Sequence, residues 1–282
     1  MGSIINGLDM PDIFNQIKAL IQYRHLVWSL ALKDIEVRYR SPILGFLWAI
    51  IVPLITVFIF KLIFSTIMKV EVENYPFFIY IMTAIFPWAY FSTSVASATE
   101  SIFSNRELIK KTYFPRQVIP VSVVLANLIN FLPAVIVMLL IIAFFKMQFT
   151  ILIFLLPVII LLQTILTIGL ALIFSSLQVI LRDIKYIVEI FLMAWFYLSP
   201  GFYSLTIVAN ISEKFFKFYM LNPFVGLFSL YRIVLLKRYE TTLPSSVNIF
   251  GLTIWTTVVC IVVFLLGFVV FKKYESRFSD LV

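Results

Sequence analysis

Long apolar runs separated by short charged segments dominate the pattern of this 282-residue chain. Several of these runs exceed the roughly 20 apolar residues that a helix needs to cross the hydrocarbon of a bilayer. The pattern predicts an all-α integral membrane protein with six transmembrane helices. The expected spans are residues 44–68, 76–98, 118–145, 151–177, 184–198 and 249–271.

Two amphipathic segments precede the first run. Asp9 and Pro11 can start one helix, and Pro42 ends the other. In each segment the apolar residues fall on one helical face, as they do in helices that lie along a membrane surface. Residues 1–43 are therefore expected to form cytoplasmic interface helices. The expected apolar stripes are Ile13, Phe14, Ile17, Leu20 and Ile21 in the first helix and Trp28, Leu32, Ile35 and Tyr39 in the second.

Residues 199–236, between the fifth and sixth spans, are apolar but interrupted. Helix-breaking or polar residues recur in the segment, so two half-helices fit it better than one span. We expect them to be re-entrant, dipping into the outer leaflet where protein covers their free backbone groups. The interrupting residues are Pro200, Gly201, Asn210, Asn222 and Pro223.

Charge supports this topology. Charged residues make up 13% of the chain, against about 25% in soluble domains. The N-terminal region lacks the apolar core of a signal peptide, so both termini are expected in the cytoplasm. Fourteen Lys and Arg residues then lie inside and seven outside, as the positive-inside rule requires. The net charge of +8 therefore reflects topology and not nucleic-acid binding. The seven outer residues are Lys69, Lys146, Lys214, Lys217, Arg232, Lys237 and Arg238.

Few polar groups suggest chemistry within the chain. Cys260 and His25 are the single residues of their types, so neither a disulfide nor a metal site is expected. None of the eight glycines precedes a lysine, so the chain has no P-loop, and another chain would have to bind ATP. Glu189 is the single carboxylate expected in a span, which gives ion coupling little support. Lys61 in the first span either faces a cavity or snorkels to the outer interface. We expect no enzyme activity and no cofactor in this chain.

Four ordered motifs resemble a known family. Residues 38–48 (RYRSPILGFLW), followed by Pro53, are similar to the entry of the first span in permeases of type-2 ABC exporters. Residues 105–116 (NRELIKKTYFPR) resemble the coupling helix of the subgroup that exports polyprenyl-linked polysaccharides. Residues 198–203 (LSPGFY) and 221–227 (LNPFVGL) resemble its extracellular gate. The likeness covers essentially the whole chain.

The resemblance implies a homodimer in the bacterial cytoplasmic (inner) membrane, with two separate ATPase subunits that bind ATP and Mg²⁺. It also implies a channel at the dimer axis, walled by the first and fifth spans. The substrate would be lipid-linked polysaccharide such as O-antigen, capsule or teichoic acid. Residues 44–282 would be the six-span ABC type-2 domain, with a coupling helix at about 100–114 and an extracellular gate at about 199–236.

Three groups of candidate residues follow from the resemblance. The ATPase-coupling candidates are polar residues of the cytoplasmic loops with two apolar anchors, and the channel candidates are aromatic because sugar faces stack on aromatic rings. The coupling group is Lys33, Glu36, Arg38, Arg40, Asn105, Arg106, Glu107, Leu108, Ile109, Lys110, Lys111, Arg182 and Asp183. The channel group is Phe46, Trp48, Phe58, Phe60, Trp195 and Tyr197. The gate group is Pro200, Gly201, Phe202, Tyr203, Asn222 and Pro223.

Rival interpretations remain open at this point. A type-2 ABC exporter of drugs or small lipids would share the topology. A membrane glycosyltransferase would need clustered acidic residues in its loops, which the sequence lacks. A non-transporting component of cell-envelope glycan synthesis, such as an assembly scaffold, would share the composition.

Overall fold

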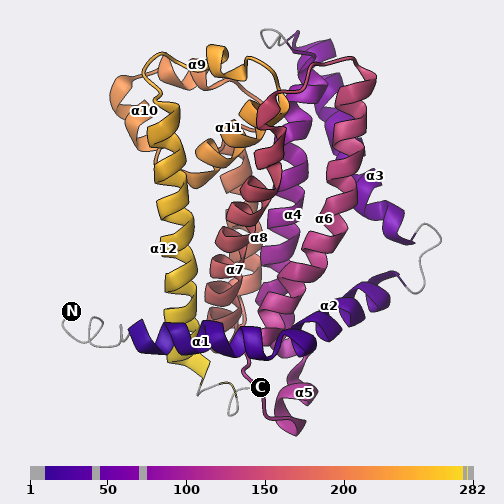
Figure 1. The fold of residues 1–282 in the computed structure, drawn as a ribbon, viewed down its shortest axis with the longest axis vertical. Coiled ribbons are helices and arrows are strands. Elements are labelled where there is room, and N and C mark those ends of the chain that lie inside the picture. The colour runs from indigo at the N-terminus through magenta and orange to yellow at the C-terminus, as the bar shows by residue number, and fades with distance from the viewer. Residues whose placement is uncertain (1–9, 40–44, 70–74, 276–277, 279–282) are drawn as a thin grey trace.

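The computed structural model describes residues 10–39, 45–69, 75–275 and 278, and most of them are helical. Figure 1 shows an upright helical bundle with two helices lying across one end. The helices are α1 (Met10–Gln22), α2 (Arg24–Tyr39), η2 (Gly45–Leu47), α3 (Trp48–Phe60), η3 (Lys61–Ile67), α4 (Phe77–Ser104), α5 (Arg106–Lys111), α6 (Val118–Phe144), η4 (Ile151–Leu155), α7 (Leu156–Ile180), α8 (Ile184–Tyr197), α9 (Leu205–Ala209), α10 (Glu213–Tyr219), α11 (Pro223–Leu235), η5 (Tyr239–Thr242) and α12 (Ile249–Glu275).

Helix α4 is the centre of the bundle. Most of its side chains are buried, and it packs against α3, α6, α7, α8 and α11. Large aromatic side chains such as Phe86 and Phe91 fill this contact. Most side chains of α3 and α8, in contrast, are not buried. The core therefore lies around α4, and α3 and α8 line its edge.

Helices α7 and α12 approach each other closely at two glycines. A Cβ placed on Gly267 would lie 2.5 Å from the carbonyl oxygen of Gly169, and one on Gly169 would lie 2.6 Å from that of Val263. Two glycines face each other because only they let the backbones approach so closely. Small residues at helix contacts are typical of membrane proteins, where packing replaces the hydrophobic effect as the driving force.

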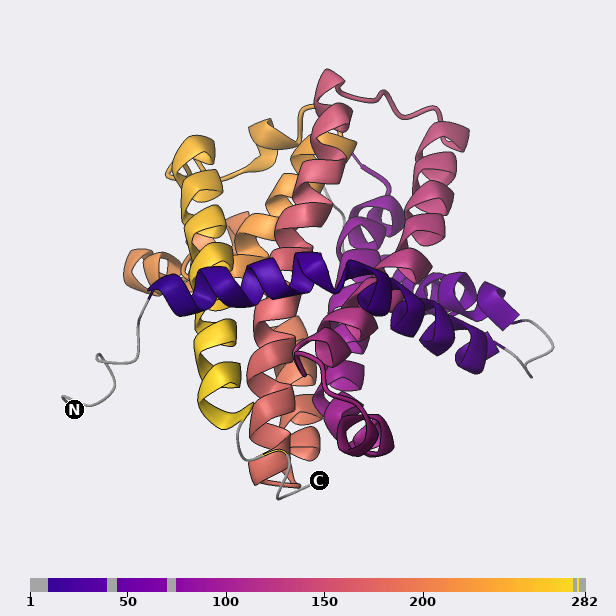
Figure 2. The ribbon, with the colours of Figure 1, turned by 60° about the horizontal axis from the view of Figure 1, so that its bottom comes forward.

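Helices α1 and α2 lie across the lower end of the bundle (Figures 1 and 2). Gln117 Nε2 donates a hydrogen bond of 2.8 Å to the carbonyl oxygen of Gln16 and so joins α6 to α1. Helix α2 packs on the bundle through a face other than its apolar stripe. Val27 and Ala31 are buried, whereas Trp28 and Leu32 are exposed. The wider apolar side chains face away from the bundle because the small Ala31 permits a close contact with it.

Five described helical segments are long and apolar enough to cross a membrane, and they match the predicted first four spans and the sixth. The predicted fifth span is α8, whose 14 residues make a helix about 21 Å long. That length is short of the roughly 30 Å hydrocarbon core, so its crossing stays a prediction. Helices α10 and α11 together would pass as a sixth segment, but they are bent by 83°.

The segment after α8 forms three helices, not two. Asn222 ends the turn after α10, and its side chain accepts a hydrogen bond of 3.0 Å from the backbone N–H of Phe224. This is an N-cap, and Pro223 follows at the first helical position, where it is well tolerated. All residues from Phe224 to Leu235 are buried in the described fold. Helix α11 thus enters the bundle, and α9 and α10 cover its outer end (Figure 1).

The first span changes its winding near its outer end. From Lys61 to Ile67 the chain is a π-helix, a rare form that often occurs at functional sites. Lys61 is exposed, and its ammonium lies 5.1 Å from the ring centre of Phe78 in the first turn of α4. This position favours snorkelling toward the outer interface over burial in a cavity.

Replacing Gly267 by leucine should separate α7 from α12. We expect overpacking to lower the free energy of unfolding by about 1–3 kcal/mol, visible as a lower midpoint of thermal unfolding in detergent. Gly251 is a matched control on the same helix, because a Cβ there would meet nothing closer than Asn248 at 3.8 Å. A Gly267→Leu protein as stable as Gly251→Leu would contradict the close contact.

Candidate functional site

Helix α5 projects from the lower end of the molecule (Figure 1). Asn105 joins it to α4, because its side-chain Nδ2 donates to the carbonyl oxygen of Ser101 at 2.9 Å and its own carbonyl accepts from the N–H of Leu108 at 3.0 Å. The charged residues of α5 are all exposed, so this short helix presents a polar surface. They are Arg106, Glu107, Lys110 and Lys111.

The apolar residues of α5 face the protein itself. Ile109 is buried in a cluster with Phe114 and Val118, and Leu108 packs against the same cluster. The predicted anchor residues therefore hold α5 against the bundle, and charged side chains remain for a partner. Lys111 and Glu107 form an exposed i,i+4 ion pair at 3.3 Å, which adds little stability.

A surface hollow of 580 Å³ lies beside α5 and gathers several predicted residues. Arg106 from α5 lines it together with Arg182 and Asp183 from the turn between α7 and α8. Lys185 pairs with Glu100 at 3.0 Å and so ties the start of α8 to α4. The structure thus brings α5 and the turn between α7 and α8 to one concave surface.

The coupling candidates on α2 behave differently from one another. Lys33 and Glu36 are exposed, and Arg40 lies outside the described residues. Arg38 turns toward the bundle, where its Nη1 donates to Asn127 Oδ1 of α6 at 2.7 Å. Arg38 therefore joins α2 to α6. Burial raises the pKa of Asp34, also on α2, and the charges of Lys33 and Arg38 oppose that shift.

The channel candidates separate into exposed and packed side chains. Trp48, Phe58 and Tyr197 are 46%, 62% and 54% exposed. Phe60 is half-buried, and the side chain of Phe46 lies outside the described part. Trp195 belongs to the packed group, because its ring contacts Trp88, Phe91, Phe191 and Phe224.

A hollow of 390 Å³ brings the predicted first and fifth spans together. Phe60 of α3 and Tyr197 of α8 line it, along with Trp88 of α4. The hollow therefore has aromatic walls contributed by the two helices that the sequence assigns to a channel. Phe58, which is exposed on α3, does not line it.

Asn222 connects α8 to α11 in the predicted gate. Its Oδ1 accepts from Trp195 Nε1 at 3.0 Å, and its Nδ2 donates to Ser199 Oγ at 2.9 Å. The same Oδ1 caps α11 through Phe224. One amide thus fixes the end of α8, the following turn and the start of α11. Tyr203 adds a hydroxyl contact of 2.8 Å to Tyr219 of α10.

Arg232 is buried, although the sequence predicts an exposed charge in an outer loop. It lies in α11 with a side chain that is 0% exposed. Its Nη2 donates to the carbonyl oxygen of Gly201 at 2.7 Å, and its guanidinium lies 3.7 Å from the ring centre of Tyr80. Nε and Nη1 have no hydrogen-bond partner among the described residues. A lone arginine inside the apolar run 223–236 is the signal that could have indicated burial.

Tyr80 completes the contact between α4 and the gate turn. Its hydroxyl donates to the carbonyl oxygen of Tyr203 at 3.0 Å, while its ring faces Arg232. Two carbonyls of the turn, those of Gly201 and Tyr203, are therefore held by α11 and α4. Pro200 and Gly201 are buried, and Phe202 stays half-buried against Phe60 and Phe64.

Comparison with known proteins gives a consistent result. The family model described as ABC-2 type transporter matches residues 25–236. A protein of Myxococcus xanthus named O-antigen export system permease protein RfbA is 32% identical over 264 residues, covering 94% of this chain and 98% of that protein. A protein of the same name from Klebsiella pneumoniae is 32% identical over 253 residues, covering 88% and 92%.

The matched region begins in α2 and ends just after α11, so it includes the interface contact at Arg38, the α5 surface and the gate. The similarity thus spans every part of the candidate site. The chain belongs to the ABC-2 type transporter family.

Proposed function

We propose that this chain is the membrane-spanning subunit of an ATP-driven exporter of lipid-linked polysaccharide of the O-antigen class. The observation that carries the proposal is the similarity, over nearly the full length of both chains, to permeases named for O-antigen export. The chain itself lacks a P-loop, so a separate ATPase subunit supplies the energy. Its place is the cytoplasmic membrane of a bacterium.

The ATPase docks on the charged surface of α5 and the neighbouring hollow. Support comes from the convergence of Arg106, Arg182 and Asp183 at one concave surface. Ile109 fixes α5 to the bundle, so a push on this short helix moves α4 and not a loose loop. The Lys185–Glu100 pair carries the same movement to α8.

The polysaccharide passes along a channel between two copies of the chain. The exposed faces of α3 and α8 support this arrangement, since they leave Trp48 and Tyr197 without cover in one copy. Aromatic rings suit a sliding glycan because each stacking contact is modest and replaceable. The turn at Gly201, held by Arg232 and Tyr80, closes the outer end.

Depleting the protein in the bacterium that carries it tests this function. Surface polysaccharide should fall severalfold, and polymer on its lipid carrier should accumulate inside the cell. Antibody labelling of intact cells and extraction of lipid-linked glycan measure the two quantities. Unchanged surface polysaccharide together with a changed sensitivity to drugs would contradict the proposal and favour a drug exporter.

Charge reversal on α5 tests the coupling surface. Arg106→Glu with Lys110→Glu should reduce export at least severalfold while the protein still inserts, because both side chains are exposed and support no internal contact. Lys214→Glu with Lys217→Glu on α10 is the control of equal charge change at the other end of the molecule. Export that stays normal in the α5 variant would refute docking there.

Replacing Arg232 by methionine tests the gate. The loss of its hydrogen bond to Gly201 should loosen the turn, so that liposomes containing the variant leak small ions severalfold faster. Thermal stability should change little, because a buried charge with two unpaired nitrogens is costly to keep. Arg238→Met, at an exposed position, is the control. If liposomes with Arg232→Met leak ions no faster than wild type, Arg232 does not hold the turn at Gly201 closed.

A further inference from the structure

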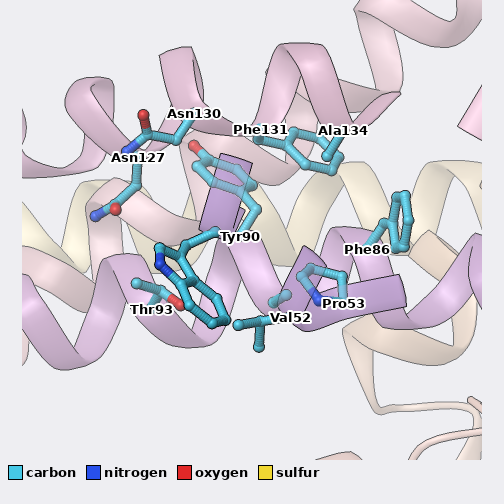
Figure 3. A pocket seen from close by; sticks show the side chains of 11 residues that line it. Val52, Pro53, Phe86, Tyr90, Thr93, Asn127, Asn130, Phe131 and Ala134 are labelled. Atoms are coloured by element: carbon cyan, nitrogen blue, oxygen red, sulfur yellow. The ribbon is translucent and has the colours of Figure 1, made fainter. Parts of the chain in front are cut away.

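A cavity of 240 Å³ lies between α3, α4 and α6 (Figure 3). Its walls are mostly apolar, with Phe86 at one end, and the amides of Asn127 and Asn130 lie together at the other end. The two amides share a helical face because they are three residues apart. The remaining lining residues are Trp48, Val52, Pro53, Ala89, Tyr90, Thr93, Phe131 and Ala134.

Asn130 has no hydrogen-bond partner in the described structure, although it is only 6% exposed. Neither its Nδ2 nor its Oδ1 is paired. An unpaired buried amide destabilises the fold, and polar side chains inside membranes usually have a function. The hydroxyl of Tyr90 does not help, because it bonds Thr164 of α7 at 3.0 Å. A ligand in the cavity would supply the missing partners.

The polar end of the cavity lies in the half of the bundle that α1 and α2 contact. Asn127 and Asn130 follow the start of α6 by about 13 and 18 Å along the helix axis. Arg38 of the interface helix reaches the same level, because its Nη1 bonds Asn127 Oδ1 at 2.7 Å. Arg38 forms no ion pair of 4 Å or less with a carboxylate of the described residues, and its charge also acts on Asp34 of α2. The guanidinium thus contacts one of the two amides that line the cavity.

We propose that this cavity, with Arg38 at its mouth, binds the phosphate-bearing end of a membrane lipid, and that the lipid is the polyprenyl phosphate carrier of the exported glycan. Arg38 suits a phosphate because its planar guanidinium keeps further N–H donors beyond the one used by Asn127. Asn130 donates to a phosphate or ester oxygen, and Val52 and Phe131 contact the first part of the tail.

The volume agrees with a headgroup and excludes a whole lipid. The cavity measures 240 Å³ and is partly open. That space holds a phosphate and a short piece of chain, while the rest of the tail stays among the lipids beside α3. The inference rests on the proposed function for its choice of carrier. Arg38 and the amides argue for the phosphate independently of it.

Lipid binding by the full-length chain, measured by native mass spectrometry, tests the inference. The probes are undecaprenyl phosphate, undecaprenol without phosphate, and phosphatidylglycerol. Of the three probes, wild type should bind undecaprenyl phosphate best. Asn130→Leu and Arg38→Gln should each raise its dissociation constant about tenfold, which is a loss of about 1.4 kcal/mol of binding free energy. Asn130→Leu should unfold no earlier than wild type, since it removes an unpaired amide. Arg24→Gln, an exposed change at the far end of α2, should bind normally.

Each departure has a defined meaning. The proposed site is wrong if Asn130→Leu binds undecaprenyl phosphate as tightly as wild type does. It is also wrong if wild type binds undecaprenol as tightly as undecaprenyl phosphate. Phosphatidylglycerol binding that matches undecaprenyl phosphate and shows the same losses overturns the carrier assignment. None of these results would contradict the proposed export function. That function fails separately if a wild-type complex binds the carrier lipid but does not move polysaccharide.

Discussion

Hydrocarbon offers no hydrogen bonds, and this constraint determines where the interrupted segment after α8 can lie. If this segment dips into the bilayer, as we propose, side chains must hold the backbone carbonyls of its turns. Arg232 and Tyr80 hold the carbonyls of Gly201 and Tyr203, and Asn222 caps α11. Once the turn is held, α11 can enter the bundle beside α4 and α12. The outer end of the molecule therefore depends on a small set of polar contacts.

The same constraint makes the remaining buried polar groups informative. Arg232 and Asn130 both keep atoms unpaired in the described structure. A fold selected for stability alone would replace such groups by apolar side chains of similar size. Arg232 belongs to the proposed gate, and Asn130 lines the cavity that we propose binds a lipid phosphate.

The spans were predictable because long apolar runs need only local information. Details that depend on distant partners were not. The packed face of α2 is set by the bundle, which accepts Ala31 closely and leaves Trp28 outside. The burial of Arg232 could not be predicted, because the guanidinium packs on the ring of Tyr80, which lies far away in the sequence. Trp195 was predicted for the channel, yet its indole bonds Asn222, a pairing that no spacing reveals.

Transport itself is the most direct test of the account. The chain should be reconstituted with its ATPase in liposomes loaded on one leaflet with lipid-linked polysaccharide, and the glycan should then be probed with an enzyme that cannot cross the membrane. The account predicts that ATP moves the glycan to the other side, changing its digestion in step with hydrolysis. Digestion that is the same with and without ATP, in liposomes whose ATPase is active, would contradict it.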